Sequence, residues 1–102
     1  MVIEWLKFQV TGVSRETYVQ KDEEIWTTAL AKYPGFMGKE VWISPHNPEE
    51  IVFVIQWKSR KAWHSIPESE LAEIEKRFDD VIGKHNYKLV EEGEYQIRKF
   101  AR

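Results

Sequence analysis

The 102-residue sequence contains no cysteine and has few residues that interrupt regular structure, with four prolines and five glycines. Without cysteine, the chain cannot form disulfides, thiolate nucleophiles, iron–sulfur clusters or cysteine-ligated zinc sites. The five glycines are isolated from one another, so there is no glycine-rich loop for phosphate. A G-x-S-x-G nucleophile elbow is also absent.

The sequence also lacks a basic excess and a long apolar run. Lys and Arg number 15 against 17 for Asp and Glu, which gives a net charge of -2. Proteins dedicated to nucleic acids usually carry a basic excess, so we expect no nucleic-acid partner. The longest apolar run, Ile51 to Ile55, is too short to cross a membrane, and Glu4 lies where a secretory signal would be apolar. We therefore expect a cytoplasmic protein with no membrane partner.

Aromatic side chains are abundant, at 14% of residues, and they include five Trp. No linker, repeat or low-complexity stretch divides the chain, so residues 1–102 are expected to form a single domain.

The residue pattern predicts elements in the order β-α-β-β-α-β. Strands are expected over residues 2–10, 36–44 and 51–57, and helices over 15–32 and 68–82. Ser14 and Gly83 are the expected N-cap and helix stop, and Ser59 is expected to cap a short turn through Trp63. A last strand is expected over 87–90 and 94–100, broken at Glu92-Gly93. This order predicts a ferredoxin-like α+β fold, an antiparallel sheet with both helices on one face.

The strands at residues 2–10 and 51–57 carry apolar side chains on both faces. In the second of them, Phe53 and Trp57 share one face while Val52 and Val54 share the other. The uncovered face of a two-layer domain would meet water, and a large exposed apolar patch marks an interface. We therefore predict a homodimer in which two sheets face each other and enclose a cavity.

Two motifs and the order of elements resemble the dimeric α+β barrel superfamily, and within it the antibiotic-biosynthesis-monooxygenase-like proteins. The motifs are Tyr-Pro-Gly-Phe at residues 33–36 and Trp-Lys-Ser-Arg-Lys-Ala-Trp at residues 57–63. Residues 2–8 and 21–26 further resemble a small uncharacterised cyanobacterial family in that group. The resemblance implies a homodimer whose sheets form a barrel, often with the last strand reaching toward the partner. Members include cofactor-free monooxygenases acting on aromatic polyketides, haem-degrading monooxygenases, quinol oxygenases and proteins of no known activity.

The resemblance disfavours haem degradation. That branch typically pairs an Asn in the first strand, a Trp near the end of the third strand and a His on the second helix. Trp57 matches the Trp, but residues 2–10 contain no Asn and residues 68–82 no His. Other members carry a His where this chain has Ile66; His64 lies two residues earlier, about 200° away around a helix, so that role is not transferred.

Asp22 is the most informative single residue. At about 100° per residue it falls within the apolar stripe of the first helix, near Tyr18 and Trp26. A carboxylate there must find hydrogen-bond donors or carry a raised pKa. It could be a general base, or a structural carboxylate that accepts from a Tyr hydroxyl, an indole N–H or Arg15. A folded and active Asp22→Asn protein would exclude the catalytic role.

Other candidate residues would bind the substrate or move protons. The candidates for binding a flat molecule are aromatic: Trp57, Trp63, Trp5 and Phe53. Trp57 could stack a substrate through its indole face, or it could be a core or interface residue. His64 could be an acid–base group near the cleft mouth, or an exposed helix residue without chemistry. The three His never share metal-ligand spacing, so we expect no metal site and no cofactor.

The favoured interpretation is that the protein is a homodimer whose apolar pocket binds a flat organic molecule. If it is an enzyme, cofactor-independent monooxygenation is the activity that the resemblance implies, with Trp57, Asp22 and His64 as the groups to test. The alternative is a non-catalytic binding or regulatory dimer, and a third reading is an interaction protein whose apolar face serves only dimerisation. A roomy pocket faced by Asp22 or His64 would favour the enzyme. A purely apolar open pocket would favour binding, and a packed one would favour interaction.

Overall fold

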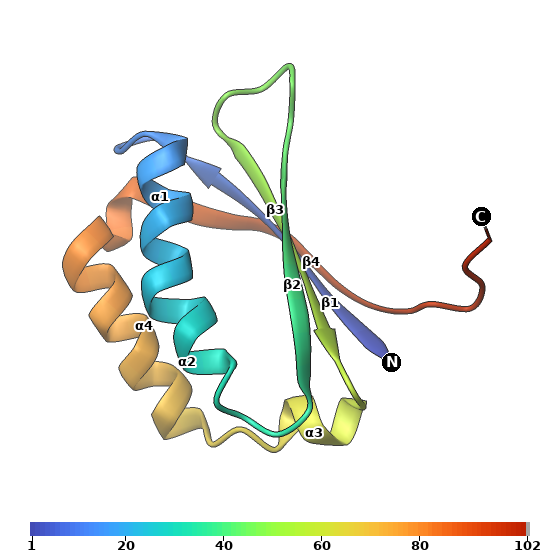
Figure 1. Ribbon diagram of the computed structural model, residues 1–102. Helices are drawn as coiled ribbons and strands as arrows, with labels where there is room; N and C mark the ends of the chain where they lie inside the picture. The colour runs from blue at the N-terminus through green and yellow to red at the C-terminus, as the bar shows by residue number, and fades with distance from the viewer. Residues whose placement is uncertain (102) are drawn as a thin grey trace.

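The computed structural model describes residues 1–101 and has the predicted order of elements (Figure 1). The strands are β1 (Val2–Val10), β2 (Phe36–Ile43), β3 (Glu50–Trp57) and β4 (Tyr87–Gln96). They form one antiparallel sheet in the order β2-β3-β1-β4. The helices lie on one face of this sheet, as Figure 1 shows, which confirms the ferredoxin-like α+β fold. Within residues 1–101, no helix is long and apolar enough to span a membrane.

The capping and stop residues that the sequence indicated are found at three helix ends. Helix α1 (Arg15–Asp22) starts after Ser14, whose hydroxyl accepts a 3.0 Å hydrogen bond from the Thr17 backbone N–H. Ser59 caps α3 (Arg60–His64) in the same way, accepting from the Ala62 N–H at 3.0 Å. Helix α4 (Glu68–Ile82) ends at Gly83, whose φ of 90° is accessible mainly to glycine.

The corner before β2 requires Gly35 for two reasons. Its φ is 97°, and a Cβ placed there would lie only 2.5 Å from the Ala62 Cβ of α3. The Gly35 carbonyl also accepts a 2.7 Å hydrogen bond from the Lys58 N–H. The corner therefore packs directly on α3 and fixes the position of that short helix beside the sheet.

The segment predicted as helical over residues 15–32 is helical from Arg15 to Leu30, but it is not a regular α-helix throughout. After α1 the chain forms a π-turn, η1 (Glu23–Thr27), and then one short turn of α-helix, α2 (Thr28–Leu30). In the π-turn, the Thr28 N–H donates to the carbonyl of Glu23, five residues earlier. The spacing of apolar residues does not reveal such a turn, because one extra residue changes where the apolar positions fall and the segment still reads as an amphipathic helix.

The predicted break of the last strand at Glu92-Gly93 is wrong. β4 runs unbroken through Gly93, and its register shifts instead where Lys7 pairs with Glu91 and the next residue of β1 with Leu89. A Cβ at Gly93 would lie 2.8 Å from the Tyr95 ring, so this glycine makes room for a ring. The strand also ends at Gln96, short of residue 100.

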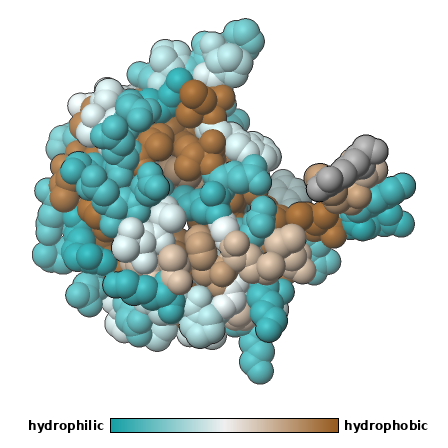
Figure 2. Space-filling view, viewed as in Figure 1, coloured by the Kyte–Doolittle hydropathy of each residue, from teal (hydrophilic) through white to brown (hydrophobic). Residues whose placement is uncertain are grey.

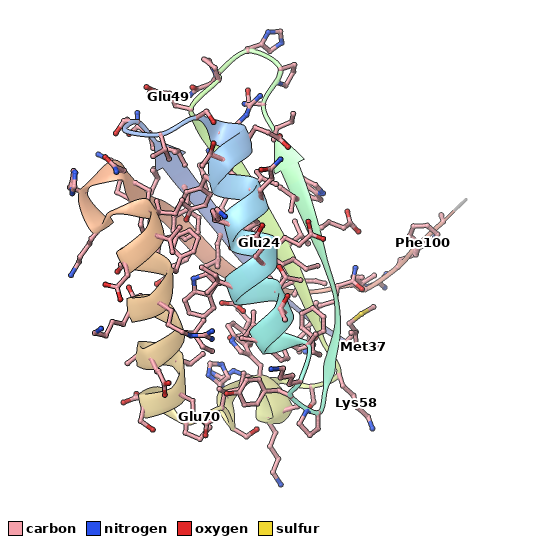
Figure 3. All side chains as sticks on the ribbon, turned by 60° about the vertical axis from the view of Figure 1, so that its left-hand side comes forward. Glu24, Met37, Glu49, Lys58, Glu70 and Phe100 are labelled. Carbon is pink, nitrogen blue, oxygen red and sulfur yellow. The ribbon has the colours of Figure 1, made fainter. Side chains whose placement is uncertain are left out.

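The chain beyond β4 projects from the body of the molecule (Figure 1). Apolar side chains are visible on this segment in Figure 2, and Ile97 and Phe100 are 47% and 77% exposed. Phe100 lies near its far end (Figure 3).

The two faces of the sheet carry separate apolar clusters. The larger lies under the helices and includes Phe53 and Trp57, while the smaller lies on the open face and consists of Ile3, Val52 and Val54. Each of these three residues is less than a tenth exposed even in the single chain. The open face is therefore apolar at its centre, as the alternation in β1 and β3 predicted.

Candidate active site

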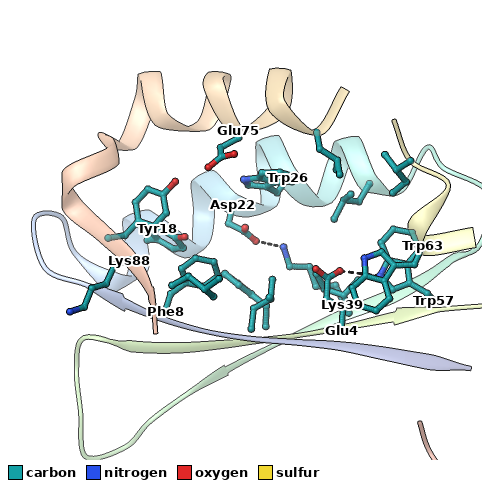
Figure 4. A pocket seen from close by; sticks show the side chains of 18 of the residues that line it. Glu4, Phe8, Tyr18, Asp22, Trp26, Lys39, Trp57, Trp63, Glu75 and Lys88 are labelled. Carbon is teal, nitrogen blue, oxygen red and sulfur yellow. Dashed lines mark hydrogen bonds and ion pairs between the residues drawn. The ribbon is translucent and has the colours of Figure 1, made fainter. Parts of the chain in front are cut away.

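A cavity of about 510 Å³ lies between the sheet and the helices (Figure 4). Its volume is within the range of roughly 300–1,000 Å³ that holds small organic ligands. Aromatic side chains form much of its wall: Phe8, Tyr18, Trp26, Phe53, Trp57, Trp63 and Tyr87. The cavity expected from the sequence lies between two sheets of a dimer, whereas this one lies on the helix side of the sheet within one chain.

The π-turn aligns the helical residues that face the cavity. Tyr18, Asp22, Trp26 and Leu30 all line it, at a constant spacing of four residues. In a regular α-helix this spacing would drift by about 40° per step, or about 120° in total. One extra residue in the π-turn rotates the later positions back by about 100°, so the four side chains stay nearly in line. Asp22 and Trp26 therefore both reach the cavity.

Two charged side chains of the sheet also line this cavity, and both belong to residues that pair with the same residue of β3. Ile55 of β3 pairs with Glu4 of β1 on one side and with Lys39 of β2 on the other. Directly opposed residues of antiparallel strands point to the same face, so both side chains project under the helices and line the cavity. Neither residue was among the site residues expected from the sequence. The alternation of side chains along β1 carries a signal for Glu4, because this residue shares its face of the strand with the apolar Leu6 and Phe8.

Asp22 and Lys39 form a buried ion pair in the cavity. Their side chains are 6% and 4% exposed, and Figure 4 shows Lys39 reaching from the sheet toward Asp22 on the helix layer. The Lys39 Nζ also lies 4.4 Å from the centroid of the Phe53 ring. Burial raises the pKa of the Asp22 carboxyl, although the Lys39 ammonium opposes the shift.

The apolar stripe thus placed Asp22 correctly, but its partner is neither a Tyr, an indole nor Arg15. The Arg15 guanidinium instead donates to the backbone carbonyls of Ser44, Asn47 and Glu50, and so holds the loop between β2 and β3.

Trp57 is fully buried and is bonded to Glu4. Its indole Nε1 donates to the Glu4 Oε1 at 3.1 Å, and its ring packs edge-on against Phe36 with centroids 5.7 Å apart. Burial raises the pKa of the Glu4 carboxyl, and the hydrogen bond from Trp57 opposes the shift. The only donor of Trp57 is therefore used within the chain, and its ring remains as part of the cavity wall.

The structure brings four of the six candidate residues together. Asp22, Phe53, Trp57 and Trp63 line the cavity, whereas Trp5 packs against the apolar cluster on the opposite face of the sheet. His64 does not line the cavity but stacks on Trp63, with ring centroids 4.3 Å apart.

His64 instead faces the end of β4. Its Nε2 lies 3.9 Å from the Glu94 Oε1, and the side chain is 46% exposed. Within residues 1–101, no three His, Asp or Glu side chains gather closely enough to hold a metal ion.

Several solved structures have the same architecture as this chain. SnoaB, a cofactor-independent oxygenase from Streptomyces nogalater, shares 14% identity over 97% of this chain and 94% of its own, with a TM-score of 0.75. A monooxygenase from the gene ActVA-Orf6 of Streptomyces coelicolor, solved with nanaomycin D, shares 16% identity over 99% and 90%, with a TM-score of 0.67. A conserved protein from Methanosarcina mazei shares 19% over 93% and 90%, with a TM-score of 0.66.

At these identities the solved structures establish a shared fold, and the activities in their names remain theirs. No curated protein sequence matches the chain. The model of one family, antibiotic biosynthesis monooxygenase, matches residues 1–73, most of the 102-residue sequence. The protein therefore belongs to the antibiotic biosynthesis monooxygenase family.

Proposed function

We propose that the cavity binds a flat organic molecule and that the protein oxygenates it without a cofactor, with Asp22 as the general base. The observation that carries the proposal is a roomy aromatic cavity with a buried carboxylate facing into it. A packed interior would have favoured an interaction protein, and a purely apolar one a binding module. The activity named for SnoaB supports oxygenation as the reaction type.

The proposed reaction balances with dioxygen alone. Asp22 removes a proton from an activated CH₂ group of a conjugated substrate, and the resulting carbanion transfers electrons to O₂. The peroxide formed at that carbon then loses water. The methylene becomes a carbonyl, with one oxygen atom retained and the other released in H₂O, so no external reductant is consumed. Aromatic walls suit such a substrate because they stack on its conjugated rings.

The ion pair supports a second candidate, a non-catalytic binding protein that uses the same cavity. Lys39 already bonds the Asp22 carboxylate, and a buried carboxylate held in this way is less free to take a proton. In this reading Asp22 only keeps Lys39 in place.

Oxygen uptake distinguishes the two candidates. A panel of flat polycyclic ketones that carry an activated CH₂ group, such as anthrone, is offered to the wild-type protein, to Asp22→Asn and to Glu24→Gln, an exposed control just beyond Asp22 in the chain (Figure 3). We expect turnover by the wild type and the control, and a loss of about a hundredfold or more in a folded Asp22→Asn protein. Because burial raises the pKa of Asp22, the acid limb of the pH profile should lie above the usual aspartate range. Uniform absence of turnover would favour the binding protein.

We further propose a homodimer formed through the open face of the sheet. The apolar cluster at the centre of this face is bordered by Trp42 and Tyr95, which are 49% and 57% exposed. Light scattering after size exclusion should give twice the chain mass, and Trp42→Glu should shift the population toward monomer. Wild-type protein that is only monomeric at micromolar concentration would contradict the dimer.

A further inference from the structure

The buried ammonium of Lys39 has more hydrogen-bond donors than the chain uses. A lysine ammonium carries three N–H groups. Within residues 1–101, Lys39 makes one hydrogen bond, to Asp22, although its side chain is only 4% exposed. Its other near neighbour is the face of the Phe53 ring, which attracts the charge but accepts no conventional hydrogen bond. Two donors are therefore left over in a cavity wall.

A second donor faces the same space. The Tyr18 side chain lines the cavity one helical turn before Asp22 and is 2% exposed. Its hydroxyl makes no hydrogen bond to any of residues 1–101 that the structure records. Within the described residues, no fully buried side-chain N or O atom lacks a hydrogen-bond partner, so the Tyr18 hydroxyl is open to the cavity space. Buried donors are normally satisfied by protein, water or ligand, and an acceptor in the cavity can reach this hydroxyl as well as the spare N–H groups of Lys39.

The charge around Lys39 restricts what this acceptor can be. Asp22 is paired with the ammonium, and Glu4, on the same row of the sheet, also acts on it electrostatically. Beside Lys39, two carboxylates thus accompany one ammonium, so a ligand carboxylate or phosphate placed there would meet further negative charge. Lys84 and Lys88 also line the cavity, and Figure 4 shows Lys88 at the end away from Lys39. An uncharged oxygen, such as a ring carbonyl, accepts from the ammonium without that repulsion.

We propose that Lys39 is a specificity-determining residue of the cavity, whose ammonium donates a hydrogen bond to an uncharged acceptor oxygen on a flat ligand. Asp22 and Glu4 hold the ammonium in place. This role shares one premise with the proposed function, namely that the cavity binds flat molecules. It requires no catalysis, and it holds equally for a binding protein.

Two ligands of similar outline test the proposal. Chromone is a flat bicyclic ketone, and naphthalene has a similar outline and no oxygen. Calorimetry measures the affinity of both for the wild type, for Asp22→Asn and for the double variant Lys39→Met/Asp22→Leu. The double variant removes the ammonium together with its partner, because an apolar replacement of a buried ion pair is often tolerated.

We expect the wild type and Asp22→Asn to prefer chromone by about tenfold or more, the effect of one hydrogen bond to a charged group. The double variant should bind both ligands within about threefold of each other. A preference that persists in the folded double variant, or wild-type protein that binds both ligands equally, would overturn the role of Lys39 and leave cavity binding intact. Wild-type protein that binds neither ligand would overturn the proposed function as well.

A second readout uses the wild-type protein and does not depend on the double variant folding. In protein labelled with nitrogen-15 at lysine, the Lys39 Nζ resonance should shift on addition of chromone and stay in place on addition of naphthalene. An Nζ resonance that ignores bound chromone would overturn the proposal.

Discussion

Each face of the sheet carries a strand lysine beside an aromatic ring and a carboxylate, and comparing the two shows what burial adds. On the covered face, the Lys39 Nζ lies 4.4 Å from the Phe53 ring centroid, and its side chain is 4% exposed. On the open face, the Lys7 Nζ lies 6.0 Å from the Trp5 ring and 3.5 Å from a Glu50 oxygen, with the side chain 29% exposed. Similar groups thus form a partly exposed pair on one face and a buried pair beside the cavity on the other.

A Trp–Glu hydrogen bond is repeated on the two faces as well. Under the helices the Trp57 Nε1 donates to Glu4 at 3.1 Å, and on the open face the Trp42 Nε1 donates to Glu40 at 2.9 Å. Trp57 is fully buried, while Trp42 is 49% exposed. The pairs alone therefore do not define a site. The site arises where the helix layer covers the pair and leaves a cavity beside it.

The largest expected difference between the faces is in the two lysines. Lys39→Met leaves the Asp22 carboxylate buried without its cation, so it should lower the free energy of unfolding by about 3–5 kcal/mol. Lys7→Met removes a partly hydrated pair and should cost about 0–1 kcal/mol. Urea unfolding of both variants gives the comparison, and equal losses would show that burial adds nothing to the effect of the Lys39–Asp22 pair on stability.

The two Trp–Glu pairs should differ by less. Trp57→Phe removes the donor that bonds Glu4 and leaves a gap in the wall, so we expect a loss of about 1–3 kcal/mol. Trp42→Phe keeps an aromatic ring at a position that is 49% exposed in the single chain, so its cost should be under about 0.5 kcal/mol. Thermal unfolding followed by far-ultraviolet circular dichroism measures both. A larger loss for Trp42→Phe would reverse the assignment of the two faces.

The smallest effect is a pH dependence that belongs to Glu4. Burial raises the pKa of Glu4 above its ordinary value of 4.5, so the folded chain holds this proton more tightly than the unfolded chain does. The resulting stabilisation is complete below the unfolded pKa and is lost as pH rises through the folded pKa. The stability of the wild type relative to Glu4→Gln should therefore fall as pH increases above about 4.5.

Denaturation midpoints across that pH range measure the trend, and Glu40→Gln on the open face is the matched control. The same slope in both comparisons would mean that burial of Glu4 does not govern its protonation.

Much of the fold could be predicted because capping and stop residues act locally. Helix α4 begins after Pro67 and ends at Gly83, and both ends agree with the sequence pattern. Gly93 misled the prediction of β4, because its role depends on the ring of Tyr95, and no local pattern contains that contact. The projecting segment after Gln96 also carries strand-like residues without a neighbouring strand.

The site could be predicted only in part, for a similar reason. Asp22 was found because a charge inside an apolar helical stripe is visible in the sequence. Glu4 and Lys39 come together only through their shared neighbour Ile55, and that register joins three strands. Trp5 was assigned to the pocket because both faces of β1 looked apolar, and the sequence alone did not show which face the helices cover.

If ligands bind on the covered face of the sheet, the five tryptophans provide a direct test. Trp26, Trp57 and Trp63 line the cavity, while Trp5 and Trp42 belong to the open face. Indole N–H resonances are recorded by nitrogen–proton correlation NMR during a titration with chromone. We expect shifts at the three cavity indoles and none at the other two. Shifts at Trp5 and Trp42, with the cavity indoles unchanged, would show that the ligand binds on the open face instead.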